Sequence, residues 1–225
     1  AAVADLVITN HAMLAISAFE GLAVLPDYDV VVIDEAHELQ DRVTGAVTGQ
    51  LSGTMISAAV TAARKHTSAS VEELAAAGRA FDASVEGLPA GLMPSGLNEE
   101  QQLAVSRVRE AARVALSDSK PEGGDAGDGG RQMARSRLLA VLELCERVLE
   151  APESGEVLWS SRPSTFSPGE GYSPPDDSAP ATLNVAPISV AGRLRDGLFD
   201  GHTVVLTSAT LAIGSEFGPV AGGLG

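Results

Sequence analysis

The sequence predicts an α/β fold in which a sheet domain is interrupted by a helical insertion. Short apolar, β-branched runs lie near both ends of the chain, most clearly at residues 30–33 and 203–206. Between them, four segments repeat apolar residues at helical spacing: 55–65, 71–85, 99–116 and 132–149. Strands at both ends with helices between them are typical of a sheet domain that carries an inserted domain.

The order of these segments sets the expected domain boundaries. The ends of the chain are expected to hold strands at 5–9, 28–33, 182–185 and 203–206 and helices at 12–19 and 190–199. The unbroken run at 30–33 favours a strand buried on both faces, as in a parallel sheet covered by helices. We assign the sheet domain to residues 1–49 together with 183–225. The helical insertion is assigned to residues 50–150, and an irregular linker with a short strand to residues 151–182.

Charge and cysteine content exclude some classes of protein. The net charge of −15 argues against a protein that coats nucleic acid without specificity. Cys145 is the single cysteine, so an internal disulfide or an all-cysteine metal site is excluded, and a small buried apolar role is expected for it. The chain has no run of eighteen apolar residues, so no membrane-spanning helix is expected.

The basic residues are concentrated in the middle of the chain, where residues 64–147 hold 11 of the 15 Lys and Arg. Six arginines in the two longest helical segments are candidate nucleic-acid contacts: Arg107, Arg109, Arg113, Arg131, Arg135 and Arg137. The alternative is that they are ordinary solvated faces of helices.

Two acidic residues directly follow the strand at 30–33, in the sequence Asp34-Glu35-Ala36-His37. Ligands of open parallel sheets bind at the carboxyl ends of the strands, so both carboxylates are expected in a cleft. Asp34 suits Mg²⁺ held through water, and Glu35 suits a general base that activates an attacking water. The alternative is an Asp-Glu pair that caps the following helix.

Small hydroxyl residues follow the strand at 203–206, in the sequence Thr207-Ser208-Ala209-Thr210. Such side chains can form hydrogen bonds to His37 or Asp34 without filling the cleft. A network of this kind can report on the γ-phosphate and couple hydrolysis to domain movement. His11, which follows the expected strand at 5–9, is interpreted as a structural histidine at a strand end, and the alternative is a position near this cleft.

These motifs together resemble the DinG/XPD family of superfamily 2 DEAH-box DNA helicases. Residues 32–39 (VIDEAHEL) resemble motif II of superfamily 2, and residues 205–211 (VLTSATL) resemble motif III. Residues 4–14 resemble the segment that follows the iron–sulfur region in this family, and residues 185–199 resemble the stretch before motif III. The long gap between the two motifs resembles the Arch insertion of the family.

The resemblance implies a partial RecA-like motor domain with an Arch-like insertion, from an ATP-dependent 5′-to-3′ DNA helicase of bacterial DNA repair. It implies that Asp34 and Glu35 serve Mg²⁺ and water, while His37, Ser208 and Thr210 couple ATP to single-stranded DNA. A cytoplasmic, monomeric protein is expected. The resemblance also implies a 4Fe–4S cluster in a longer parent chain, ligated by cysteines that precede residue 1.

Other functions stay open at this stage. The chain has no Gly-x-x-x-x-Gly-Lys-Ser/Thr loop to hold β- and γ-phosphates, so we expect the 225 residues alone to hydrolyse ATP negligibly. The helical insertion can instead be the functional part, as a module that binds single-stranded DNA or a partner without catalysis. A third alternative is a Walker-B-type ATPase that does not unwind DNA.

Overall fold

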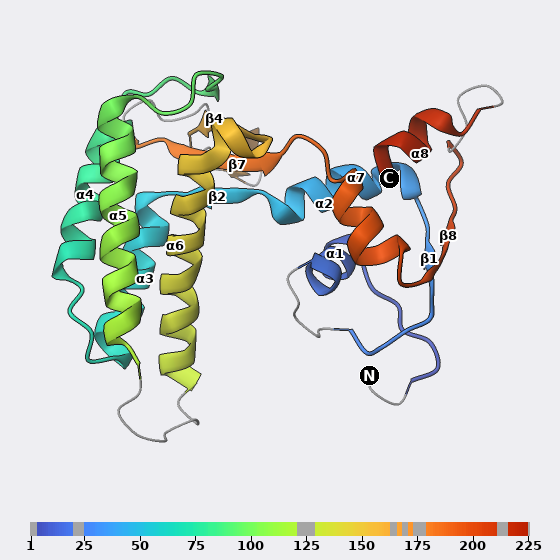
Figure 1. Cartoon of the computed structure of the whole chain (residues 1–225), viewed down its shortest axis with the longest axis horizontal. Helices are drawn as coiled ribbons and strands as arrows, with labels where there is room; N and C mark the ends of the chain where they lie inside the picture. The colour runs from blue at the N-terminus through green and yellow to red at the C-terminus, as the bar shows by residue number, and fades with distance from the viewer. Residues whose placement is uncertain are drawn as a thin grey trace. The chain divides into compact units, whose positions relative to one another are not determined.

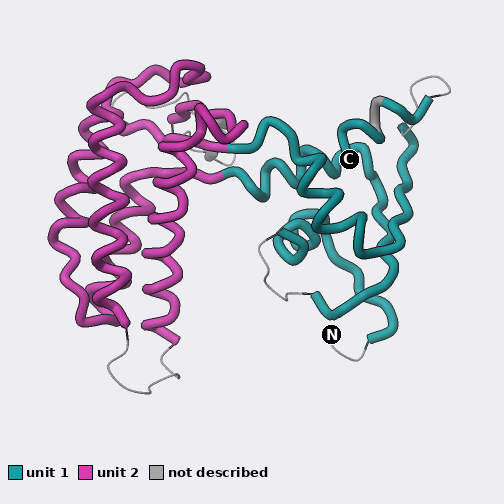
Figure 2. Tube along the Cα trace, viewed as in Figure 1, with its two compact units in different colours: residues 1–48, 186–225 teal, residues 49–185 magenta. Residues whose placement is uncertain are grey.

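The computed structural model places the chain in two compact units. It describes residues 4–19, 25–120, 129–162, 166–167, 171–172, 179–210 and 216–224. Unit 1 comprises residues 1–48 and 186–225, and unit 2 comprises residues 49–185 (Figure 2). Within the described residues, none of the helices combines the length and hydropathy needed to cross a lipid bilayer.

Unit 1 is built on a parallel pair of strands, β1 (Val30–Ile33) and β8 (Thr203–Leu206). Its helical elements are α1 (His11–Phe19), η1 (Ala36–Glu38), α2 (Leu39–Val47), α7 (Ala191–Leu194), the π-helical turn η2 (Arg195–Phe199) and α8 (Gly218–Leu224). The core lies between the strands and these helices and includes Ile33, Leu39, Leu194 and Leu198. The predicted α/β class with a parallel pair is therefore confirmed (Figure 1).

The register of β1 and β8 is fixed at both ends of the pair. Before the strands, the rings of Tyr28 and His202 stack with centroids 4.4 Å apart. At the ends of the strands, the Thr207 amide donates to the Ile33 carbonyl at 2.8 Å. The pairing puts Ile33 opposite Leu206, so the residues that follow each strand are also neighbours.

Unit 2 is a bundle of four helices with a small sheet. The helices are α3 (Gly53–His66), α4 (Glu72–Val85), α5 (Glu99–Asp118) and α6 (Gly129–Ser154), and each packs against the next, with α6 returning to α3. The sheet has the order β2 (Gly49–Leu51), β7 (Thr182–Pro187), β4 (Glu156–Ser161) and β3 (Gly91–Leu92). A short antiparallel pair joins β5 (Phe166–Ser167) to β6 (Gly171–Tyr172).

Local sequence accounts for the helix ends of the bundle. Asn98 and Gln101 form a reciprocal capping box at the start of α5, with bonds of 2.9 and 3.0 Å. The Ser52 hydroxyl accepts from the Met55 amide at the start of α3. Cys145 lies in the core as expected, where burial raises the pKa of its thiol to about 12 and keeps it neutral.

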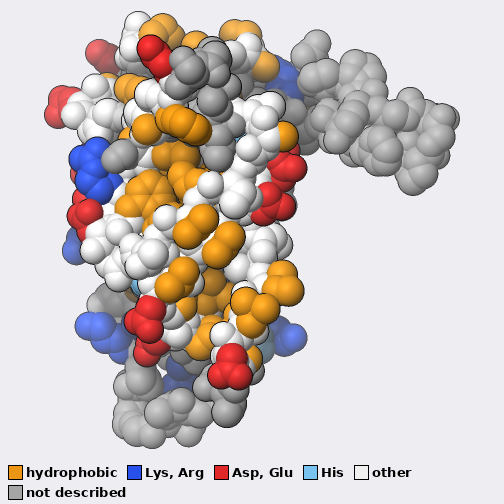
Figure 3. All heavy atoms as spheres, turned by 90° about the vertical axis from the view of Figure 1, so that its right-hand side faces the viewer, with side chains coloured by type: hydrophobic (Ala, Val, Ile, Leu, Met, Phe, Trp, Pro, Cys, Tyr) orange, Lys and Arg blue, Asp and Glu red, His pale blue; other side chains and the backbone are white. Residues whose placement is uncertain are grey.

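Two expectations about unit 1 are wrong. Residues 5–9 form no regular strand, and their apolar side chains Leu6 and Ile8 are 78% and 90% exposed. The strand β1 is covered on one face only, since Ile33 is buried while Val32 is 64% exposed. Figure 3 turns the right-hand side of Figure 1 toward the viewer and shows hydrophobic side chains exposed along the middle of that face.

The division into units also differs from the expected boundaries. The expected strand at 182–185 pairs antiparallel with β2 and so belongs with the helical unit, as do β3 and β4. Of the expected linker, residues 163–165, 168–170 and 173–178 lie outside the described residues. Its described part holds the end of α6, β4 and the β5–β6 pair, and β4 is an internal strand in the sheet of unit 2.

A partly buried ion pair joins the last long helix of unit 2 to its sheet. Arg147 of α6 donates to Glu156 of β4 at 2.6 Å and to the Val185 carbonyl of β7 at 3.3 Å. The Glu156 side chain is 10% exposed and that of Arg147 is 30% exposed. Removing the arginine therefore leaves a carboxylate that is shielded from water and has lost its partner.

We predict that Arg147→Met lowers the free energy of unfolding of unit 2 by about 2 kcal/mol. The matched control Arg64→Met breaks the exposed pair of Arg64 with Glu72, and it should cost under about 0.5 kcal/mol. Urea unfolding followed by the far-ultraviolet helical signal measures both. Equal effects of the two substitutions would contradict the structural role of the buried pair.

Candidate active site at the ends of two parallel strands

The pairing of β1 with β8 brings the two sequence motifs together. The Thr207 hydroxyl donates to Asp34 Oδ1 at 2.7 Å, and His37 Nδ1 lies 2.8 Å from Ser208 Oγ. The partners of each pair are separated by 173 and 171 residues in the sequence. The two polar strand ends therefore form one site, as the sequence analysis predicted for Asp34 and Ser208.

The carboxylate of Asp34 is held in its ionised form by hydrogen bonds. The Thr207 hydroxyl, and then the Glu35 amide at 3.0 Å, lower the pKa of Asp34 below its ordinary value, and the nearby His11 adds a smaller effect. Both hydrogen bonds end on Oδ1. The other oxygen, Oδ2, can therefore accept from a water of a hydrated cation.

Glu35 has an unusual backbone. Its φ of 49° and ψ of 44° place it in the left-handed region, and no other non-glycine residue of the described chain has a positive φ. For a side chain with a Cβ atom this conformation costs about 1 kcal/mol or more. The turn is stabilised by two backbone hydrogen bonds, from the Ala36 amide to the Thr207 carbonyl and from the Glu38 amide to the Glu35 carbonyl.

The side chain of Glu35 turns toward His37, whose Nδ1 lies 3.2 Å from Glu35 Oε2. The same nitrogen contacts Ser208, and Ser208 Oγ lies 3.4 Å from Thr210 Oγ1 and accepts from the Thr210 amide at 3.2 Å. Glu35, His37, Ser208 and Thr210 thus form one connected chain of polar contacts. Of the five predicted site residues that follow the strands, four belong to this chain of contacts and the fifth, Asp34, directly precedes Glu35.

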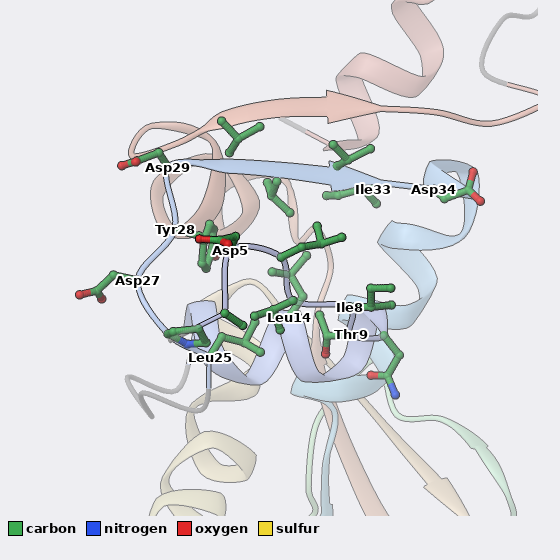
Figure 4. A pocket seen from close by; sticks show the side chains of 18 of the residues that line it. Asp5, Ile8, Thr9, Leu14, Leu25, Asp27, Tyr28, Asp29, Ile33 and Asp34 are labelled. Atoms are coloured by element: carbon green, nitrogen blue, oxygen red, sulfur yellow. The ribbon is translucent and has the colours of Figure 1, made fainter. Parts of the chain in front are cut away.

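A cavity of 720 Å³ lies along β1 and reaches Asp34 (Figure 4). Residues 4–11, Leu14 and residues 25–33 line the rest of it. Its lining includes three further carboxylates, Asp5, Asp27 and Asp29, but no Lys or Arg. The cavity as described therefore offers no side-chain cation to balance the charge of a triphosphate.

The residues around Asp34 suit Mg²⁺, which takes many of its ligands from water and substrate, and do not suit a metal whose ligands are all protein side chains. Among the described residues, no three of His, Cys, Asp and Glu converge on one point. Mg²⁺ keeps several waters and is commonly held by one or two carboxylates together with substrate phosphates, which matches a lone exposed Asp34.

The six predicted arginines lie in α5 and α6 of unit 2 and have different surroundings. Arg113 pairs with Glu110, Arg135 donates to the Leu116 carbonyl and to Ser119, and Arg137 donates to the Ala58 carbonyl at 3.5 Å. Arg131 also has a partner. Arg107 is exposed and Arg109 is half-buried.

Sequence reasoning left two participants undecided. It expected the hydroxyls of residues 207–210 to bond His37 or Asp34 without saying which; the parallel register pairs Asp34 with Thr207, because Ile33 pairs with Leu206 and these are the next residues. For His11 a structural role was preferred and a position near the cleft was the alternative; its Nε2 lies 2.9 Å from the carbonyl oxygen of Asp34, which places it beside the cleft. No local pattern indicated the left-handed backbone of Glu35.

Comparison with known proteins agrees with this geometry. The chain is 34% identical, over 227 aligned residues and 98% of its length, to proteins named ATP-dependent helicase DinG from Mycobacterium tuberculosis and Mycobacterium bovis. The chain is similar to part of these DinG proteins. It spans 32% of the length of these relatives. No family model matches the chain. The α/β architecture of unit 1 fits part of a RecA-like domain of such a DinG-like helicase.

The hydroxyl of Thr207 is the largest cause of the lowered pKa of Asp34, so its removal has a measurable result. We predict that Thr207→Val raises the pKa of Asp34 toward the ordinary value, whereas Thr207→Ser keeps it low. A ¹³C-detected carboxyl titration measures the midpoint. Thr44→Val is the matched control, because the Thr44 hydroxyl bonds within α2. An unmoved midpoint in Thr207→Val would contradict the assigned cause.

Proposed function

We propose that unit 1 of this DinG-like chain is part of the motor of an ATP-dependent 5′-to-3′ DNA helicase that serves DNA repair. The observation that supports this most directly is the bonding of Asp34 to Thr207 and of His37 to Ser208 across two parallel strands. A carboxylate for Mg²⁺, a base for water and hydroxyls that contact both are the groups that nucleotide hydrolysis needs at such a strand end.

Asp34 and Glu35 have separate roles in this proposal. Asp34 would hold a hydrated Mg²⁺, and the lowered pKa keeps its carboxylate charged. The metal, when bound, neutralises charge on the β- and γ-phosphate oxygens. Glu35 accepts the proton of the attacking water, and its position is set by the turn that follows β1.

His37 couples the two strands through a single nitrogen. Nδ1 lies within 3.2 Å of Glu35 Oε2 and 2.8 Å of Ser208 Oγ. When Nδ1 carries a proton it can donate to Glu35; when it carries none it can only accept, and Ser208 is then the donor. The two arrangements exclude one another, so a movement of Ser208 or Thr210 alters how Glu35 is held.

The phosphate-binding cations of the motor are expected outside this chain. Neither the cavity lining nor the sequence provides a lysine in a phosphate-binding loop. The exposed apolar side chains of β1, such as Val30 and Val32, lie on one face of the strand pair and fit a sheet that further elements cover on that face. A 4Fe–4S cluster, a cytoplasmic location and a monomeric state remain predictions from the resemblance.

We predict that Glu35→Gln lowers the rate of DNA-stimulated ATP hydrolysis by the full-length helicase at least about 100-fold. The substitution removes the base and keeps the size of the side chain. Glu38→Gln is the matched control, because Glu38 is three residues away and pairs with Arg42; it should stay within about threefold of the parent. The 225-residue chain alone should show negligible turnover.

This experiment also separates the motor from its alternatives. Full activity in Glu35→Gln would remove the basis for the proposed catalytic role. Normal ATP hydrolysis without DNA unwinding in the parent would favour a motor ATPase of another kind.

Unit 2 is proposed to act as an Arch-like element that contacts single-stranded DNA. Support comes from the exposed Arg107 on α5, whereas Arg135 is occupied by the end of α5 and Arg113 by Glu110. An exposed guanidinium can neutralise a phosphate and release counterions. Arg135 instead satisfies the Leu116 carbonyl at a helix end, so its removal should affect stability first.

We predict that Arg107→Ala weakens binding of single-stranded DNA by the full-length protein and reduces the salt dependence of log K by about 0.7 for each lost phosphate contact. Arg79→Ala, which removes an exposed arginine of α4, is the control and should leave both values unchanged. Fluorescence anisotropy at several salt concentrations measures them. An unchanged slope in Arg107→Ala would favour an ordinary solvated helix face.

A further inference from the structure

The peptide unit between Asp34 and Glu35 is held at both of its ends. Its carbonyl oxygen lies 2.9 Å from His11 Nε2, and its amide donates to Asp34 Oδ1 at 3.0 Å. Because a carbonyl oxygen only accepts, Nε2 is the donor in the first bond. The orientation of this peptide determines φ of Glu35, which is 49°.

The next peptide unit is held by backbone bonds alone. Its amide, that of Ala36, donates to the Thr207 carbonyl at 3.0 Å, and its carbonyl, that of Glu35, accepts from Glu38 at 2.9 Å. These bonds determine ψ of Glu35. His11 is therefore the one described side chain from outside the two strand-end motifs that bonds to the peptides flanking Glu35.

The position of His11 is itself well determined. It is the first residue of α1, and Asn10 caps this helix by accepting from the Met13 amide at 2.8 Å. One turn later, Leu14 and Ala15 are buried in the core of unit 1 together with Ile33 and Ala36. The helix thus has a fixed place beside the turn and can hold the imidazole against the Asp34 carbonyl.

We propose that His11 is a positioning residue for hydrolysis. By donating to the Asp34 carbonyl it keeps Glu35 in the left-handed conformation and so places the Glu35 carboxylate for the attacking water. This inference rests on the proposed function of Glu35 as the base. His11 acts through the backbone of Glu35 and does not touch the reacting atoms.

The test compares His11→Gln with His11→Met in the full-length helicase. Both side chains are unbranched and of similar length, but only glutamine has a donor at the position of Nε2. We expect His11→Met to lower kcat for ATP hydrolysis at least about tenfold with KM for ATP within about threefold, because misplaced catalytic groups reduce the rate of the chemical step. His11→Gln should restore kcat to within about threefold of the parent.

A second comparison uses the Glu35→Gln background. There, His11→Met should have no further effect on the residual rate, because a residue that acts through Glu35 has nothing left to position. Equal kcat values in the Gln and Met variants, or additive losses in the double variant, would overturn the inference. Full activity of Glu35→Gln itself would instead reject the proposed function, so the two failures are distinguishable.

Discussion

The parallel register of β1 and β8 is the constraint on which the site depends. It brings together residues more than 170 positions apart, and it is fixed by the Tyr28–His202 stack at one end and the backbone bond from Thr207 to Ile33 at the other. Side chains alternate along a strand, so a slip by one residue would expose Ile33. The same slip would move Thr207 away from Asp34. Core packing and the polar site are therefore determined by one pairing.

The insertion between β1 and β8 is compatible with their pairing because the two ends of unit 2 lie side by side. Its first and last strands are antiparallel neighbours, with Gly49 opposite Val185, so the chain enters and leaves at adjacent points. A Cβ atom at Gly49 would clash with the end of the Leu144 side chain, so that side chain would have to shift. The entropic cost of closing a loop between β1 and β8 grows only slowly with the length of the insertion. The inserted helices are also packed around a core of their own.

The sequence was sufficient wherever a pattern is local and repeated. Helical periodicity located the four helices of the bundle to within a few residues, and the two β-branched runs located β1 and β8. Apolar character alone could not separate a strand from an exposed segment, which is why residues 5–9 were misjudged. It also could not show that β7 pairs with β2, because strand pairing depends on distant partners. The functional roles of the site residues remain proposals.

The backbone of Glu35 lies beyond local prediction for a physical reason. Glutamate rarely adopts positive φ, and it does so here only because bonds from three separate segments act on adjacent peptides: His11 from α1, Thr207 from the end of β8, and Glu38 from the same turn. Because this conformation is strained, the loss of any one of these bonds weakens what holds it. Because Thr207 directly precedes Ser208, displacement of the β8 end acts on both the backbone of Glu35 and, through His37, its carboxylate. The strain in the turn therefore makes the position of the proposed base, Glu35, depend on the end of β8, which carries the second motif.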